Sequence, residues 1–160
     1  MAAKRVEVLE FRVEEPAAVV ERMDRIGEAH RGWVNLRPSL PPEEEPPAPS
    51  PIGAIFSTEV HDVPVCTWVA GKAGRHQTEP DSLGVQHSAG TRTVAHLASI
   101  GLALPEGWRP VQDHPRRGLV VHPPVGTGHR DELEWLLMVG TALSKVRLRG
   151  DWYAEIHGGP

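Results

Sequence analysis

The side chains best suited to chemistry gather in residues 112–124, which read QDHPRRGLVVHPP. Asp113 and His114 are an acid and a base side by side, and Arg116 and Arg117 could hold a carboxylate or phosphate through paired hydrogen bonds. Neighbours on an extended strand point to opposite faces, so Asp113 and His114 can act together only if the chain turns here. The proline and the glycine within this stretch favour such a turn.

A second segment must fold onto this turn before the turn can form a site. The stretch from residue 71 to 90 is rich in Gly, Ser, Pro and Asp, and it is longer than most loops, which indicates a use or some local structure. We expect this stretch to meet the turn. It supplies four side chains of suitable type, Asp81, Gln86, His87 and Ser88. Gln86 and Ser88 would then contact an anion that the arginines of the turn bind.

Together the two segments suggest a proton-transfer site. In this interpretation His87 and His114 move protons, Asp113 orients an imidazole, and Arg116 or Arg117 holds an anionic group. The structural alternative is that Asp113 caps the turn and both arginines stay in water, while the residues that follow enter the core as a strand. The sequence leaves both interpretations open.

Other motifs with a defined chemistry are absent from the sequence. Nine histidines are many for 160 residues, but none of them forms an H-x-H or H-x-x-x-H pair, and a proline and a glycine interrupt the strand that would align His114 with His122. We therefore expect no metal site and no cofactor. Asp131 and Glu132 follow two glycines at a helix start, where acids favour the helix dipole and repel a phosphate. Both are interpreted as capping residues.

Composition narrows the class of protein. The chain carries a formal charge of −4, with 39% hydrophobic and 24% charged residues, which is typical of one globular domain and argues against nucleic acid or a membrane surface as a partner. The single Cys66 lies in an apolar stretch and cannot form an internal disulfide. No apolar run is long enough to span a bilayer, and the N-terminus lacks the pattern of a signal peptide. These features predict a cytoplasmic protein.

The first third of the chain predicts a strand, a helix and a flexible segment. Residues 5–13 are rich in Val, Leu and Phe with partial alternation, which favours a strand. Pro16 suits the first turn of a helix that ends near Gly32. Four apolar residues repeat at helical spacing within it: Val19, Val20, Met23 and Ile26. Residues 37–51 hold seven prolines and three consecutive glutamates, so we expect a flexible, extended surface segment there.

The rest of the chain alternates between short strands and two further helices. The predicted strands are 52–57 and 63–70, paired as a hairpin, then two within 107–124, and a last strand or hairpin within 146–157. Thr91 is expected to cap a short helix that stops near Gly101. Residues 130–144 give the clearest amphipathic helix of the chain.

This order of elements predicts a single α+β domain over residues 1–160. We expect a mixed, largely antiparallel sheet with about three helices packed mainly on one face. The first strand and helix, with the late strand, helix and strand, could be the two halves of a ferredoxin-like sandwich.

The sequence supports two functions from different classes. The first is a domain that binds a protein partner or a small anionic ligand, and the alternative is a small hydrolase or transferase that uses the proton-transfer site described above. Nucleic acid is not expected as a partner, and both a monomer and a homodimer are compatible with the sequence. Fourteen arginines against three lysines are typical of a GC-rich bacterial genome, such as that of an actinobacterium.

Overall fold

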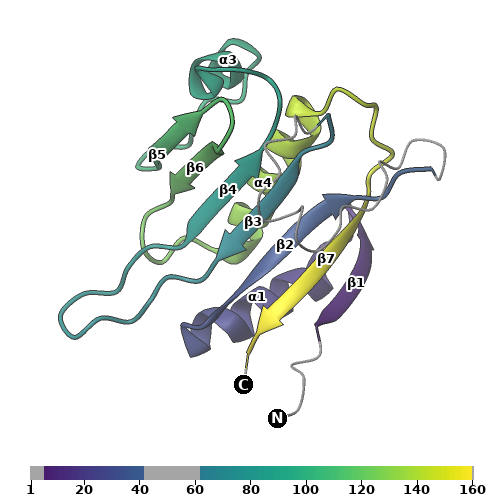
Figure 1. Cartoon of the computed structure of the whole chain (residues 1–160). Coiled ribbons are helices and arrows are strands. Elements are labelled where there is room, and N and C mark those ends of the chain that lie inside the picture. The colour runs from purple at the N-terminus through teal and green to yellow at the C-terminus, as the bar shows by residue number, and fades with distance from the viewer. Residues whose placement is uncertain (1–5, 42–61, 160) are drawn as a thin grey trace.

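The computed structural model describes residues 6–41 and 62–159, which form one sheet and three helices (Figure 1). The α+β fold that the sequence predicts is confirmed. The strands are β1 (Glu7–Arg12), β2 (Gly32–Pro38), β3 (Val65–Val69), β4 (Ser82–Gln86), β5 (Arg109–His114), β6 (Gly118–His122) and β7 (Asp151–Gly158). The helices are α1 (Ala17–Ala29), α3 (Thr93–Ser99) and α4 (His129–Leu143).

The seven strands lie in the order β1-β7-β2-β3-β4-β6-β5, and every neighbouring pair is antiparallel. The C-terminal strand β7 lies between β1 and β2, which are therefore parallel to each other and are joined by α1. This split unit is what the first half of a ferredoxin-like sandwich would contain. By contrast, β6 and β7, which α4 connects, are separated by three strands. The ferredoxin-like arrangement stays a prediction.

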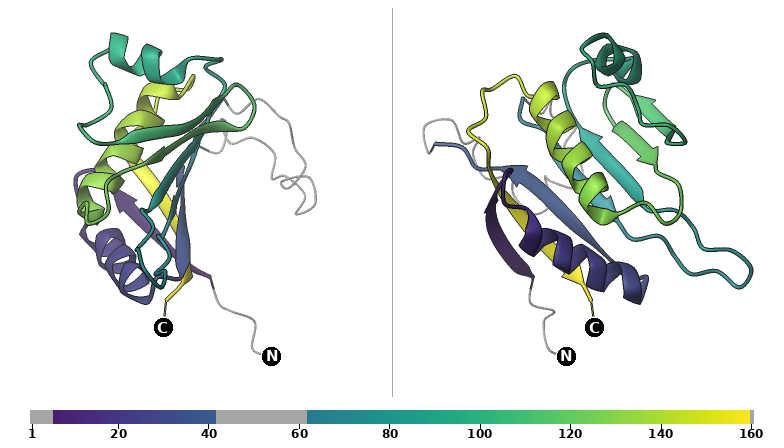
Figure 2. Two further views of the ribbon diagram at one scale, coloured as in Figure 1. Left: turned by 90° about the vertical axis from the view of Figure 1, so that its left-hand side faces the viewer. Right: turned by 180° about the vertical axis from the view of Figure 1, so that it is seen from behind.

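One face of the sheet forms the core. Alternate residues of the central strands point to this face and are buried, among them Val34, Leu36, Cys66, Trp68, Leu83, Val85, Trp152 and Ala154. Figure 2 shows that α1 and α4 cover it, whereas α3 lies beyond the end of the sheet next to β5. Helix α1 contributes Val19, Met23 and Ile26 to the core. The apolar residues whose spacing predicted these helices are thus the residues that pack against the sheet.

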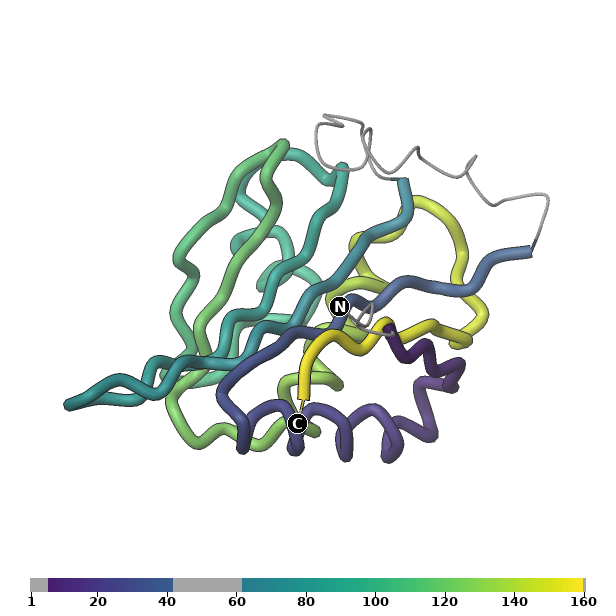
Figure 3. Tube along the Cα trace, turned by 60° about the horizontal axis from the view of Figure 1, so that its bottom comes forward, coloured from purple at the N-terminus to yellow at the C-terminus, as the bar shows by residue number. Residues whose placement is uncertain are grey.

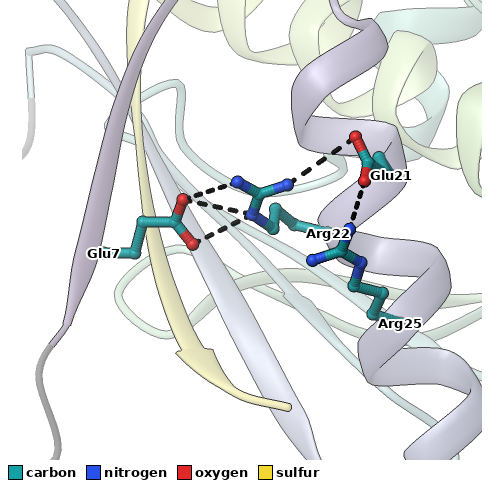
Figure 4. A network of polar contacts seen from close by, with 4 residues as sticks. All are labelled: Glu7, Glu21, Arg22 and Arg25. Atoms are coloured by element: carbon teal, nitrogen blue, oxygen red, sulfur yellow. Dashed lines mark hydrogen bonds and ion pairs between the residues drawn. The ribbon is translucent and has the colours of Figure 1, made fainter. Parts of the chain in front are cut away.

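Helix α1 is also tied to the edge strand β1 by ion pairs (Figure 4). Arg22 donates from Nε and Nη2 to the two carboxylate oxygens of Glu7 at 2.9 and 2.8 Å. Such a paired contact fixes orientation as well as distance. Arg22 also lies 3.7 Å from Glu21, which pairs with Arg25 on the same helix. These contacts fix the position of α1 relative to β1, the strand at the edge of the sheet.

Two strands occur where the sequence did not predict them. Residues 32–38 form β2, so a strand reaches into the first residues of the segment predicted to be flexible, most of which lies outside the described residues. β4 lies inside the stretch 71–90 that was predicted to be a loop. β3 pairs with β2 on one side and β4 on the other, and the expected partner at 52–57 lies outside the described residues.

The connection between β3 and β4, residues 71–81, extends well beyond the sheet (Figures 1 and 3). We refer to it as the β3–β4 arm. The arm is a narrow hairpin in which the amide of Glu79 donates to the carbonyl of Lys72 at 2.9 Å and that of Gly74 donates to Gln77 at 3.0 Å. Residues 72–79 are all exposed. Among the residues described here, no helix is long and apolar enough to cross a membrane.

Helix α4 approaches the sheet most closely at Gly140. A Cβ atom at this position would lie 2.9 Å from Cys66 Sγ and 3.0 Å from the Trp152 ring, both of which are fully buried. Overpacking of this kind costs about 1–3 kcal/mol, and the better helix propensity of alanine offsets about 1 kcal/mol. We expect Gly140→Ala to lower the free energy of unfolding in urea by up to about 2 kcal/mol. Met138→Ala, on the exposed face of the same helix, should change it by less than about 0.5 kcal/mol. Equal effects would contradict this packing.

Candidate functional site

Glu132 is an acid inside the core. It lies in the first turn of α4, but its side chain is only 1% exposed and points toward the sheet. A buried carboxyl group needs hydrogen-bond partners, because transfer from water to an apolar interior is costly. Trp68 on β3 provides one, since its indole Nε1–H donates to Glu132 Oε2 at 2.8 Å. The sequence-based capping interpretation of Glu132 is therefore incomplete, whereas its neighbour Asp131 is exposed as expected.

His129 precedes Glu132 by three residues and so lies on the same side of α4. Its Nδ1–H donates to Asp24 Oδ1 of α1 at 2.6 Å, and its Nε2 lies 3.4 Å from Asp81 Oδ2. The edge of its ring meets Trp68 with 5.1 Å between centroids. Gly27 of α1 lies against the same ring, and a Cβ there would be 2.6 Å from His129 Cε1. The imidazole is thus held on several sides.

Asp81 is the last residue of the β3–β4 arm and completes the group. Its Oδ1 accepts a hydrogen bond from the backbone N–H of Gly71, the first residue of the arm, at 2.6 Å. Its Oδ2 faces His129. Asp81 and His129 keep 17% and 18% of their side-chain surface exposed, so solvent reaches this part of the group although Glu132 is buried.

The three residues converge on one place. One ligand atom from each of Asp81, His129 and Glu132 lies within 4.8 Å of the others, an arrangement that could hold a metal ion. A second atom of each is occupied by a separate hydrogen bond, to Gly71, Asp24 and Trp68 respectively. We refer to Asp81, His129 and Glu132 as the 81–129–132 site.

The electrostatics of the site reflect this crowding of acids. Burial raises the pKa of Glu132 to about 8, and the nearby charge of Asp81 acts in the same direction. The hydrogen bond to Asp81 raises the pKa of His129 to about 9 against the effect of burial, and Asp24 adds to the rise. Burial acts to raise the pKa of Asp81, but hydrogen bonds from His129 and Gly71 outweigh it and lower that pKa. At neutral pH these shifts place the proton of the acid pair mainly on Glu132, beside an ionised Asp81 and a charged imidazolium.

The segment around His87 does meet the turn that carries Asp113. His87 is 4% exposed, and its Nδ1 accepts a hydrogen bond from the N–H of Ala89 at 3.0 Å. Its Nε2 then carries the proton and donates to Thr93 Oγ1 at 3.0 Å. Asp113 Oδ2 accepts from the N–H of Val94 at 3.1 Å and so caps α3. Burial lowers the pKa of His87, and the charge of Asp113 opposes this.

The other predicted site residues lie on the β5–β6 turn and at the end of β4. His114 Nδ1 accepts the backbone N–H groups of Arg116 and Arg117, both at 3.1 Å, and so closes the turn. Both arginine side chains are exposed, and so is Gln86, whereas Ser88 Oγ is buried without a hydrogen-bond partner among the described residues. The exposed arginines and the buried strand β6 agree with the structural alternative for the turn. However, His114 and not Asp113 closes the turn, because Asp113 caps α3. The assignment of His87, His114 and Asp113 as catalytic residues stays a prediction.

Sequence reasoning named Asp81 as a candidate but did not identify the site. The sequence has no closely spaced pair of histidines. The signal that it does contain is His129-x-x-Glu132 at a helix start, and the third residue, Asp81, lies far upstream in the chain. Asp24 and Trp68 gave no local signal at all, because both were interpreted as parts of regular elements. Comparison of the chain with protein-family models, curated protein sequences and solved structures finds no match.

The raised pKa of Glu132 determines how stability should depend on pH. Because the folded-state pKa of about 8 exceeds the usual 4.5, the contribution of Glu132 is complete below pH 4.5 and is lost as the pH rises toward 8. Glu132→Gln mimics the protonated acid and can still accept the Trp68 hydrogen bond. We expect this variant to be more stable than the wild type at pH 8–9 and to show a flatter decline between pH 5 and 8 in urea unfolding.

Glu134→Gln is the matched control, because Glu134 is exposed on the same helix and pairs only with Arg130 in the described structure. Its pH profile should follow that of the wild type. His129 should cause the remaining decline in both variants, from pH 6.5 to about 9. Parallel profiles for Glu132→Gln and the wild type would contradict a protonated Glu132.

Proposed function

We propose that this domain binds a divalent transition-metal ion at the 81–129–132 site, and through that ion a small anionic ligand. The observation that carries the proposal is that each of the three ligand residues makes two kinds of contact, one to a supporting residue and one within the site. Asp24, Gly71 and Trp68 each hold one atom of His129, Asp81 and Glu132. The three side chains also hydrogen-bond one another through Asp81, and one ligand atom of each lies within 4.8 Å of the others. A histidine whose second nitrogen donates to a carboxylate is the usual arrangement for a metal ligand, because it fixes the tautomer and the ring orientation.

The ligand types indicate which ions fit. One imidazole and two carboxylates suit Zn²⁺, Mn²⁺, Fe²⁺ or Co²⁺ better than Ca²⁺ or Mg²⁺, which prefer oxygen ligands alone. Ligand atoms about 2.0–2.2 Å from a tetrahedral zinc ion lie about 3.3–3.6 Å from one another. The distance of 3.4 Å between His129 Nε2 and Asp81 Oδ2 already falls in this range, and all the separations are within 4.8 Å. Small side-chain rotations would close the difference.

Three protein ligands leave at least one coordination position for another group. The position would face the partly exposed side of the site, between Asp81 and His129, since Glu132 is fully buried. A carboxylate or phosphate oxygen is the natural occupant for such a cation. The sequence led to the expectation of a small anionic ligand at the arginine-bearing turn, whereas the present proposal assigns such a ligand to a different part of the chain.

Calorimetric titration of tag-free, EDTA-treated protein with Zn²⁺ and Mn²⁺ tests the proposal. We expect one ion per chain. Glu132→Gln should weaken binding by more than about 100-fold, and Asp24→Asn, which changes only the support of His129, should weaken it by about 10–100-fold. Asp131→Asn is the control, since this exposed acid adjoins Glu132 in sequence. No uptake of either ion, or equal affinity in Glu132→Gln, would refute the metal site.

We also propose a cytoplasmic location for the domain. Its one cysteine, Cys66, is fully buried, and burial raises the pKa of its thiol to about 12. A thiol in this state is inert. What supports the location is that a chain with one cysteine has no internal disulfide, as is usual in a reducing compartment. Cys66 therefore contributes to packing and takes no part in the proposed function.

A second candidate function is the binding of an anion at the β5–β6 turn, with proton transfer by a small hydrolase or transferase as its extension. The observation that favours it is the meeting of the two expected segments through His87, Thr93 and Asp113. Titration with phosphate should then give measurable heat that the double variant Arg116→Ala, Arg117→Ala abolishes. The matched control is Arg147→Ala, an exposed arginine outside this turn. Unchanged heat in the double variant would remove this candidate.

A further inference from the structure

The 81–129–132 site and the β3–β4 arm share one residue. Asp81 is the last residue of the arm, and its two carboxylate oxygens face in different directions. Oδ1 accepts from the N–H of Gly71 at 2.6 Å and so joins the two ends of the arm. Oδ2 lies 3.4 Å from His129 Nε2, inside the site. Any ligand that fixes Asp81 therefore acts on the base of the arm.

A second contact links the arm to the helix that supports the site. The carbonyl of Gly71 lies 3.0 Å from His30 Nδ1, whose ring N–H donates to it. His30 is the C-terminal cap of α1, with a left-handed φ of 49°, and its amide donates to the carbonyls of Gly27 and Ile26. Asp24, which orients His129, lies less than two turns earlier on the same helix. The base of the arm thus contacts both the site and α1.

The base of the arm is tightly packed, whereas the rest of the arm is surrounded by solvent. A Cβ atom at Gly71 would lie 2.0 Å from the carbonyl oxygen of Glu79, so the two backbone segments of the arm cross in close contact there. Beyond this crossing the hairpin is held by two backbone hydrogen bonds, Glu79 to Lys72 and Gly74 to Gln77, which together form the Ala73–Thr78 bridge. With few contacts of its own, the arm depends on its base for order.

We propose that occupancy of the 81–129–132 site by a divalent cation fixes the β3–β4 arm in its observed position. The inference rests on the proposed metal site. An ion held by Asp81, His129 and Glu132 binds only the conformation in which Asp81 is in place, so it stabilises that conformation and the Gly71 contact with it. By the same linkage, holding the arm in place tightens metal binding.

Hydrogen exchange measured by mass spectrometry, with and without Mn²⁺, tests the coupling. The informative amides are those of Gly71, Gly74 and Glu79, all of which are hydrogen-bonded within the arm or to Asp81. We expect Mn²⁺ to slow their exchange at least tenfold in the full-length protein. The amides of His96 and Ile100 in and after α3, which lies next to the edge strand β5, should be unaffected.

Glu132→Gln is the matched variant, because it removes a metal ligand and leaves the Asp81–Gly71 contact intact. Its arm should exchange at the wild-type rate without metal and should not respond to Mn²⁺. If calorimetry shows binding but the arm exchanges at the same rate, or if α3 is slowed equally, the coupling is refuted and the metal site stands. If calorimetry shows no binding, the proposed function itself fails.

Discussion

A carboxyl group inside an apolar core, that of Glu132, sets conditions on the rest of the structure. Helix α4 can lie flat on the sheet only if this acid finds partners there, because a buried carboxyl group without hydrogen bonds is costly even when it is protonated. Trp68 on β3 donates to it, and Asp81 and His129 lie beside it. The position of α4, the start of β4 and the base of the arm are therefore mutually dependent. The site therefore lies where α4, α1, β3 and the base of the arm meet.

The site could not be predicted from sequence, and the reason is geometric. Its supporting residues come from α1, β3, the arm and α4, and only His129 and Glu132 are close in the chain. Acids in the first turn of a helix usually interact with its dipole in solvent. The adjacent Asp131 does so, and nothing local distinguishes it from Glu132. The side chain of Glu132 points toward the sheet because α4 is oriented about its axis so that Leu133, Leu136 and Leu137 are buried.

Much of the fold, however, follows from local patterns. Helices α1 and α4, β6 and the final strand all lie close to where periodicity predicted them, because each buries the face that the pattern identifies. β5 also lies where a strand was expected, but it has no buried residue and is held by its pairing with β6. The two strands that were missed contain residues usually found in loops. β2 starts at Gly32 and ends at Pro38, and β4 has Gly84 at its centre. Tertiary pairing on both sides overrides these weak preferences.

Gly27 has no side chain, and the His129 ring occupies the space that a methyl group there would take. This one contact between α1 and α4 therefore limits how closely the two helices approach and also fixes one side of the 81–129–132 site. Close-packed interiors transmit such changes rather than absorb them. Over evolutionary time, any substitution that shifts these two helices would therefore also change the geometry of the 81–129–132 site.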